Sequence, residues 1–182
     1  DVFDQEVEKV LASVKWDIQK ATNGDLLITC NNGLIRWRSG ESEPELVKNL
    51  GPYNEKDLSM AAFQAITEDE AGRIWLGTGY LGAISWDLST DEVKTYRHDP
   101  NDQNTVSSDD VHFAFTDNQQ NTWFGYHVMG ISMMYSVNWK YDYQLPMESA
   151  GPEDPANEVI GYAEDDRGNL YFTTPAGLVY NP

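Results

Sequence analysis

The stretch Ala65–Asp87, AITEDEAGRIWLGTGYLGAISWD, contains three short runs rich in Ile, Trp and Leu, and the turns between them contain Asp or Gly. The first turn is Glu70-Ala71-Gly72 and the second begins at Gly77. Runs of about four to six residues with this composition are typical of β-strands. Asp stabilises turns through its own backbone, and Gly adopts a positive φ without a steric penalty. The stretch therefore predicts three consecutive antiparallel strands.

The same unit recurs at a fixed spacing along the chain. A large apolar residue lies in the middle of a run at four evenly spaced positions, Leu27, Trp75, Trp123 and Tyr171. The turn residue three positions earlier is Gly24, Gly72, Gln120 or Gly168, and a second glycine follows each run at Gly33, Gly82, Gly130 and Gly177. An acid precedes the turn at Asp69, Asp117 and Asp165, whereas the first copy has Ala21. Repeats of roughly 40–50 residues with about four strands each are typical of propeller blades.

We predict an all-β, propeller-type fold with four blades, at residues 14–50, 60–96, 111–143 and 158–182. The last blade has room for three strands and lacks a fourth, which leaves an unpaired edge. Three outcomes are open: residues 1–13 close a four-bladed ring, two chains assemble into a larger ring, or the chain is part of a longer propeller. The apolar spacing in residues 7–14 also fits a short helix, so the N-terminal segment keeps both interpretations.

The polar segments between the predicted blades are expected to be loops. They are residues 51–58, 97–110 and 148–156, which are rich in Asn, Asp, Pro and Gly. The outer strand of each of the first three blades is predicted at 45–50, 92–96 and 138–143.

The composition excludes several classes of partner. The formal charge is −18, from 30 acidic and 12 basic residues, so the surface repels nucleic acid and anionic membranes. No run approaches the ~20 apolar residues of a membrane span, so we expect no membrane contact by this segment. The single cysteine, Cys30, allows no internal disulfide and is expected to pack as a small hydrophobic residue.

The loops after the second strand of each blade differ between the copies, and loops that vary on a fixed scaffold are common binding sites. The residues that we expect to contact a ligand are Asn31, Asn32, Tyr80, Tyr126 and His127. The tyrosine rings and polar tips among them suit sugar rings.

We expect no catalytic residues, metal or cofactor. His127 has no second His or Cys near it in the sequence, as a metal site would need. The repeated acids Asp69, Asp117 and Asp165 lie on separate blades, so we predict that they stabilise turns instead of converging as an acid–base pair. The sequence contains no nucleotide-binding loop.

Two stretches closely resemble the two-component regulator propeller repeat. They are Ala65–Asp87 and the following TYRHDPNDQNTVSSDDV (Thr95–Val111). The resemblance covers roughly Val14–Tyr180. It is weaker in the first copy, where Leu27 replaces Trp, and in the last, which has Tyr171.

The resemblance implies the periplasmic sensor region of a hybrid two-component histidine kinase, whose parent is anchored in the inner membrane. Such receptors detect oligosaccharides, so the implied partners are an oligosaccharide and either a second copy or further blades of the parent. This chain contains no kinase motif.

Two other functions stay open. One is a secreted propeller glycosidase or polysaccharide lyase, which would need His, Tyr or carboxylate groups gathered at one mouth of the ring. The other is a structural or dimerisation module without a ligand of its own.

Overall fold

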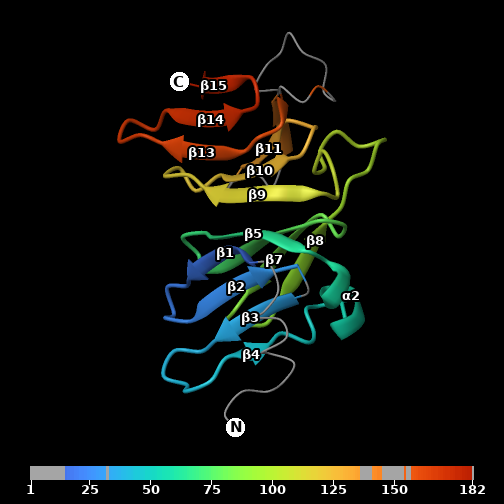
Figure 1. Ribbon diagram of the computed structural model, residues 1–182, viewed down its shortest axis with the longest axis vertical. Coiled ribbons are helices and arrows are strands. Elements are labelled where there is room, and N and C mark those ends of the chain that lie inside the picture. Colours follow the sequence, from blue (N-terminus) through green and yellow to red (C-terminus); the bar gives the residue numbers. More distant parts are fainter. Residues whose placement is uncertain (1–14, 32, 136–140, 145–153, 155–156, 182) are drawn as a thin grey trace.

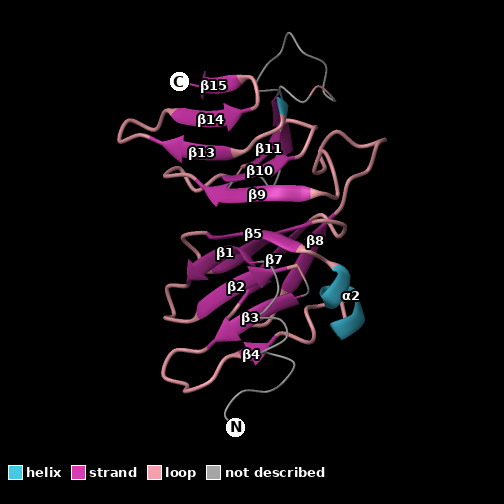
Figure 2. Ribbon diagram, in the orientation of Figure 1, coloured by secondary structure: helices cyan, strands magenta, loops and turns pink. Residues whose placement is uncertain are grey.

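The structure, a computed structural model, describes residues 15–31, 33–135, 141–144, 154 and 157–181. Four antiparallel sheets lie one after another along the molecule (Figures 1 and 2). The expected all-β, propeller-type fold is confirmed, and the last blade has three strands among the described residues.

Each sheet consists of strands that are consecutive in the chain. The first contains β1 (Lys15–Lys20), β2 (Leu26–Cys30), β3 (Gly33–Trp37) and β4 (Glu45–Leu46). The second contains β5 (Phe63–Glu68), β6 (Arg73–Thr78), β7 (Ala83–Asp87) and β8 (Val93–Tyr96). The third contains β9 (Val111–Thr116), β10 (Thr122–Tyr126), β11 (Ile131–Met134) and β12 (Tyr141–Gln144). The fourth contains β13 (Gly161–Glu164), β14 (Leu170–Thr174) and β15 (Gly177–Asn181).

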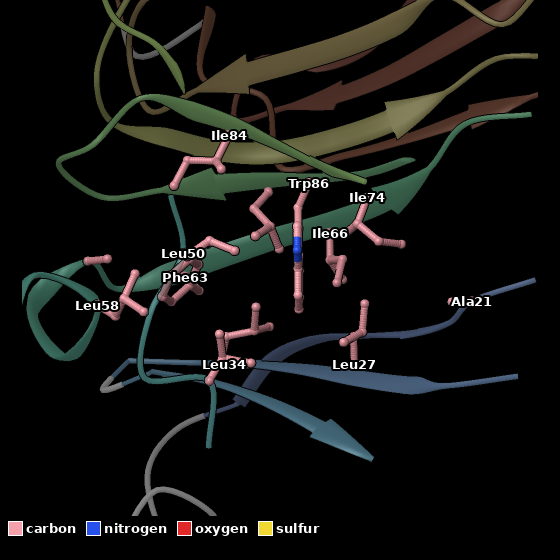
Figure 3. Packing of buried hydrophobic residues seen from close by; sticks show 13 residues of the cluster. Ala21, Leu27, Leu34, Leu50, Leu58, Phe63, Ile66, Ile74, Ile84 and Trp86 are labelled. Carbon is pink, nitrogen blue, oxygen red and sulfur yellow. The ribbon is translucent and has the colours of Figure 1, made fainter. Parts of the chain in front are cut away.

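The sheets pack face to face, with β5 lying against β1 on one side and β9 on the other. A separate apolar cluster fills each of the three spaces between successive sheets. Figure 3 shows the first cluster, in which Leu27 and Leu34 of the first sheet face Ile66 and Trp86 of the second. The first and fourth sheets lie at opposite ends in Figure 1, so the described residues form an open arc. Closure of the ring by residues 1–13 lies outside the described residues.

In the first three sheets, the repeated large residue packs against the next sheet. Trp75 is fully buried and its ring lies 5.9 Å from that of Phe124 in the next sheet. Trp123 repeats this contact with Phe172 at 6.0 Å. Burying such large side chains is a main source of stability between repeats.

Each repeated aspartate holds its hairpin through a set of hydrogen bonds that we call the aspartate clamp. In the second sheet, Asp69 Oδ1 accepts from the backbone N–H of Ala71 and Arg73, which confirms the predicted turn role. Its Oδ2 accepts from the indole N–H of Trp75 at 3.1 Å. Asp117 with Trp123, and Asp165 with the Tyr171 hydroxyl, repeat the arrangement.

The first sheet lacks both side chains of the hydrogen bond that joins the aspartate to the residue six positions later. Ala21 has no carboxylate, and Leu27, six residues later, has no donor. A second acid, Asp25, stabilises this hairpin instead, because it accepts from Arg36 Nε at 2.7 Å and from Ser39 N at 2.9 Å. Burial raises the pKa of Asp25, but the hydrogen bonds from Ser39 and Arg36, the positive charge of Arg36 and a hydrogen bond from Asn23 together hold this pKa below its ordinary value.

One predicted loop contains a helix. Residues 51–58 were expected to be a polar connection, but α2 (Glu55–Met60) starts there. Asn54 caps the helix through the N–H groups of Lys56 and Asp57, and Leu58 is buried against the first cluster. A six-residue helix with one buried side chain leaves no periodic pattern in the sequence, which is why the prediction was wrong.

The strand bounds also differ a little from those predicted. The second sheet begins at Phe63 rather than residue 60, and β4 ends at Leu46 rather than residue 50. The third outer strand is described at Tyr141–Gln144, while residues 138–140, 148–153, 155, 156 and 182 of the predicted segments lie outside the described residues.

The long connection between the second and third sheets, residues 97–110, is a loop as predicted and is held by its own contacts. The carboxylate of Asp109 accepts from His98 N and pairs with Arg97 at 2.7 Å. His98 Nδ1 lies 2.9 Å from the carbonyl oxygen of Val106, which is fully buried. These contacts fold the connection back on itself.

Within the described part of the chain, no helix has the length and apolar character needed to cross a membrane.

Candidate functional site

The predicted ligand-binding residues lie in places of very different accessibility. Tyr80, at the tip of the β6–β7 loop, is 69% exposed, and His127 is about half exposed. Asn31 is partly buried, and Asn32 lies outside the described residues. Tyr126 is fully buried. Of the four that the structure describes, Tyr80 and His127 therefore present large accessible side chains.

Tyr126 is a core residue, so its expected role as a ligand contact is wrong. Strand β10 continues through Tyr126 and is buried over its whole length. The tyrosine hydroxyl accepts a hydrogen bond from Ser107 N at 3.2 Å, and burial raises the pKa of this hydroxyl. Its function is to fasten the 97–110 connection to the third sheet.

The rim around His127 carries a row of polar side chains that the sequence analysis did not identify. His127 Nδ1 lies 3.0 Å from Glu158 Oε1, and its ring stacks on His112 with centroids 5.4 Å apart. His112 Nε2 lies 3.3 Å from Asp110 Oδ1, which also accepts from Gln64 Nε2 at 3.2 Å. We call Gln64, Asp110, His112, His127 and Glu158 the polar track. It runs from the second sheet across the third to the segment that precedes the fourth sheet.

Two members of the track occupy β-bulges at equivalent points of the repeat. The pairing of β5 with β6 skips Gln64, and that of β9 with β10 skips His112, which holds the same position one repeat later. The pairing of β1 with β2 skips residue 16 in the same way. Bulges redirect a side chain and are frequent beside functional sites. The scaffold therefore presents a different residue type at the same rim position of successive blades.

Gln64 offers an unused hydrogen-bonding atom at this rim. Among the described residues, Gln64 Oε1 is the one buried side-chain nitrogen or oxygen without a hydrogen-bond partner. A buried polar atom without a partner is unfavourable, so a donor that reached it would be bound well. The β6–β7 loop, which carries Tyr80, passes close to Gln64. A Cβ added at Gly79, the residue before Tyr80, would lie 2.9 Å from Gln64 Nε2.

The chemistry of the track suits hydroxyl groups. Carboxylates accept hydrogen bonds, imidazole nitrogens donate or accept, and an exposed tyrosine ring provides a flat face. No group of three or more metal-ligating side chains occurs among the residues that the structure describes.

The fold and the rim define the chain as a segment of a β-propeller. More particularly, residues 57–80 match the family described as two component regulator propeller, which confirms the predicted resemblance at the best-conforming repeat. No curated protein matches the sequence.

Several solved structures have a similar fold. The extracellular domain of a putative hybrid two component system from B. thetaiotaomicron has a TM-score of 0.73 at 18% identity, over 94% of this chain and 24% of that one. That of a putative one component system from the same organism has a TM-score of 0.71 at 17% identity, over 98% and 23%. A catalytically inactive virginiamycin B lyase from Staphylococcus aureus, solved with quinupristin, has a TM-score of 0.63 at 14% identity, over 91% and 54%. The chain spans about a quarter of the first two structures.

Proposed function

We propose that this chain is a ligand-sensing propeller segment of an extracytoplasmic receptor, located in the periplasm, and that it binds an oligosaccharide at the polar track. The family match and the likeness to extracellular domains of two component systems support the receptor class. The parent would be anchored in the inner membrane and signal through parts beyond this chain.

The observation that carries the proposed ligand class is the continuity of the track. Its members contact one another from Gln64 in the second blade to Glu158 before the fourth, and the exposed Tyr80 lies on the adjoining loop. A row of hydrogen-bonding side chains beside an aromatic face matches the hydroxyls and apolar faces of linked sugar rings.

Calorimetric titration with a panel of neutral oligosaccharides tests this function. We expect saturable binding to at least one member, weakened about tenfold or more by Tyr80→Ala and by His127→Ala, a loss of roughly 1.4 kcal/mol each. The matched control is Gln119→Ala, an exposed residue in a hairpin turn at the opposite end of the strands. Absence of binding across the panel, or binding that both rim variants leave intact, would refute the proposal.

A second candidate, turnover of a bound saccharide, is favoured by the two imidazole–carboxylate contacts, His127 with Glu158 and His112 with Asp110. Such pairs can transfer protons. Chromatography of the same panel after incubation separates the functions. New products that disappear with His127→Ala, and persist with Gln119→Ala, would indicate an enzyme. Unchanged oligosaccharides that nevertheless bind would support a sensor without catalysis, which is the function that we propose.

A further inference from the structure

The Gln64 side chain of the polar track offers a ligand an acceptor and not a donor. Its Nε2 donates to Asp110 Oδ1 at 3.2 Å, and an ionised carboxylate accepts hydrogen bonds but donates none. The amide nitrogen must therefore face Asp110, which turns the carbonyl oxygen Oε1 away from it. Oε1 is buried and has no hydrogen-bond partner among the described residues. A ligand group that meets this oxygen must be a hydrogen-bond donor.

The amide of Gln64 is within reach of a ligand. Gln64 as a whole is partly exposed, and the last torsion of a glutamine side chain is broad, so a small rotation of the amide brings Oε1 toward solvent. The β6–β7 loop passes the amide with Gly79, where a Cβ would lie 2.9 Å from Gln64 Nε2. A side chain at this position would press on the amide, and the glycine avoids this.

Asp110 adds a second acceptor, which carries a negative charge. Its carboxylate is 45% exposed, and its contacts with Gln64 and His112 both use Oδ1, so Oδ2 is left for a ligand. A hydroxyl group has one hydrogen to donate and serves one acceptor, whereas an ammonium group has three and serves both. A hydrogen bond to a charged group is also roughly twice as strong as one between neutral groups. This part of the track therefore favours an ammonium over a hydroxyl.

The segments that border the track are strongly acidic. The connection 97–110 contains four aspartates, and Asp154 and Glu158 precede the fourth sheet. In the described parts of these two segments, Arg97 is the one lysine or arginine, and it is paired with Asp109 at 2.7 Å. A surface of one sign of charge concentrates ligands of the opposite sign and repels those of its own sign. The rim therefore attracts a cationic sugar and repels a uronate or a sulfated sugar.

Tyr80 presents its ring from a loop that is fixed on both sides. The N–H of Gly79 donates to the carbonyl oxygen of Ala61 at 2.8 Å, and the N–H of Gly82 donates to that of Asp109 at 2.9 Å. Tyr80 between them is 69% exposed. An aromatic face held in this way binds the apolar face of a sugar and attracts a nearby cation, and it loses little freedom on binding.

We propose that the polar track recognises an amino sugar: the ligand is an oligosaccharide with free amines, of which one ammonium group binds at Gln64 and Asp110 while a sugar ring stacks on Tyr80. This inference rests on the proposed function, since it names the class of saccharide for the same site. Neutral oligosaccharides bind more weakly, because they offer no charge to Asp110. Polyamines also carry ammonium groups, but they lack the flat apolar face that a sugar ring offers to Tyr80.

Three tetrasaccharides with the same β-1,4-linked backbone test the preference by calorimetric titration. Cellotetraose, the glucosamine tetramer and the N-acetylglucosamine tetramer differ in the group on carbon 2 of each ring, which is a hydroxyl, an amine or an amide. At about pH 6 the amines are protonated, since this pH lies below the usual pKa of an amine. The glucosamine tetramer should bind about tenfold more tightly than cellotetraose. The N-acetylated tetramer has an N–H but no charge and should bind more weakly than the glucosamine tetramer.

Two variants locate the preference in the track. Gln64→Leu removes the acceptor and Asp110→Asn removes the charge, and each should reduce the tenfold ratio of the two affinities to about threefold or less. The ratio is the informative quantity, because general damage to the site would lower both affinities alike. The matched control is Asp102→Asn, which removes the same charge from an exposed turn of the same connection and should keep the ratio. Circular dichroism of each variant confirms that it is folded.

The outcomes separate this inference from the proposed function. Equal binding of cellotetraose and the glucosamine tetramer would overturn the inference and leave the function standing. Tighter binding of the N-acetylated tetramer, a ratio that Asp110→Asn leaves intact, or equally tight binding of spermine would also overturn it. Absence of binding to all three tetrasaccharides would overturn it as well, and the panel of neutral oligosaccharides then decides the function by itself.

Discussion

The aspartate clamp explains why two departures from the repeat occur together. The carboxylate and the donor six residues later approach each other across the hairpin, so either is of little use alone. Where the first sheet has Ala21 it also has Leu27, and where the carboxylate is present the donor is Trp or Tyr. Both departures are visible in the sequence, but their connection depends on which side chains meet behind the turn.

A double-mutant cycle on Asp117 and Trp123 measures this connection. Asp117→Ala should destabilise the chain by about 2–4 kcal/mol, because it leaves the buried indole N–H without a partner. Trp123→Phe removes that N–H. The destabilisation of the double variant should therefore be about 1–3 kcal/mol smaller than the sum of the two single-variant effects. Urea unfolding supplies the values. Asp102→Ala, in an exposed turn, is the control and should change stability by less than about 0.5 kcal/mol. Strict additivity would show that the clamp contact has no energetic role.

The turn residue of the third copy, Gln120, replaces a glycine and still has a φ of 66°. Gln120→Gly relieves about 1 kcal/mol of strain but loses the bond from Glu70 N, so the two effects should nearly cancel. Gln120→Ala keeps the strain and loses the bond, and should destabilise by about 1 kcal/mol. Urea unfolding of the two variants separates the strain of the positive φ from the contribution of the side-chain hydrogen bond. Equal effects of the two variants would mean that the positive φ carries no strain, and an unchanged stability of Gln120→Ala would mean that the side-chain bond contributes nothing.

At the scale of the elements, strands were predictable and their irregularities were not. Alternating apolar runs and Asp/Gly turns located all of the strands in the second sheet to within about three residues. Helix α2 left no periodic signal, and the bulges at Gln64 and His112 depend on how two strands pair, which a single sequence does not contain. For that reason the sequence analysis placed Tyr80 and His127 in accessible loops but did not identify the other members of the polar track.

The cap of α2 provides a test at this scale. Asn54→Ala removes the acceptor for two N–H groups of the first turn, which typically costs about 1 kcal/mol. The amide of Leu58, which donates to the Asn54 carbonyl at 3.0 Å, should then exchange about fivefold faster in hydrogen-exchange measurements. Lys56→Ala leaves the cap intact and is the control. Equal exchange in both variants would mean that packing of Leu58 alone holds the helix.

At the scale of the whole molecule, carboxylates have two opposing effects. A net charge of −18 opposes folding at neutral pH through self-repulsion, whereas individual carboxylates stabilise the hairpins through hydrogen bonds. Hydrogen bonds from Asn169 hold the pKa of Asp165 below its ordinary value, and those from Ser39 and Arg36 do the same for Asp25 against the effect of burial. A carboxyl with a lowered folded pKa stabilises the fold above its unfolded pKa and loses that contribution as the pH falls through the folded value.

The urea midpoint should therefore stay nearly constant from about pH 7 to 5 and fall below about pH 4, near the ordinary pKa of Asp. Asp165→Asn cannot titrate at this position, so its stability should depend less on pH in that window. Urea titrations at a series of pH values give both curves. A midpoint that rises on acidification would mean that relief of charge repulsion outweighs the loss of these hydrogen bonds.

The connection of residues 97–110 has a consequence for processing of the protein. A polar surface loop of this length is usually the first place that a protease cuts. Here Arg97 and His98 are both tied to Asp109, and Ser107 is fastened to the hydroxyl of the buried Tyr126. A protease must straighten several residues in its cleft, so trypsin should spare the Arg97–His98 bond until the third blade itself has unfolded.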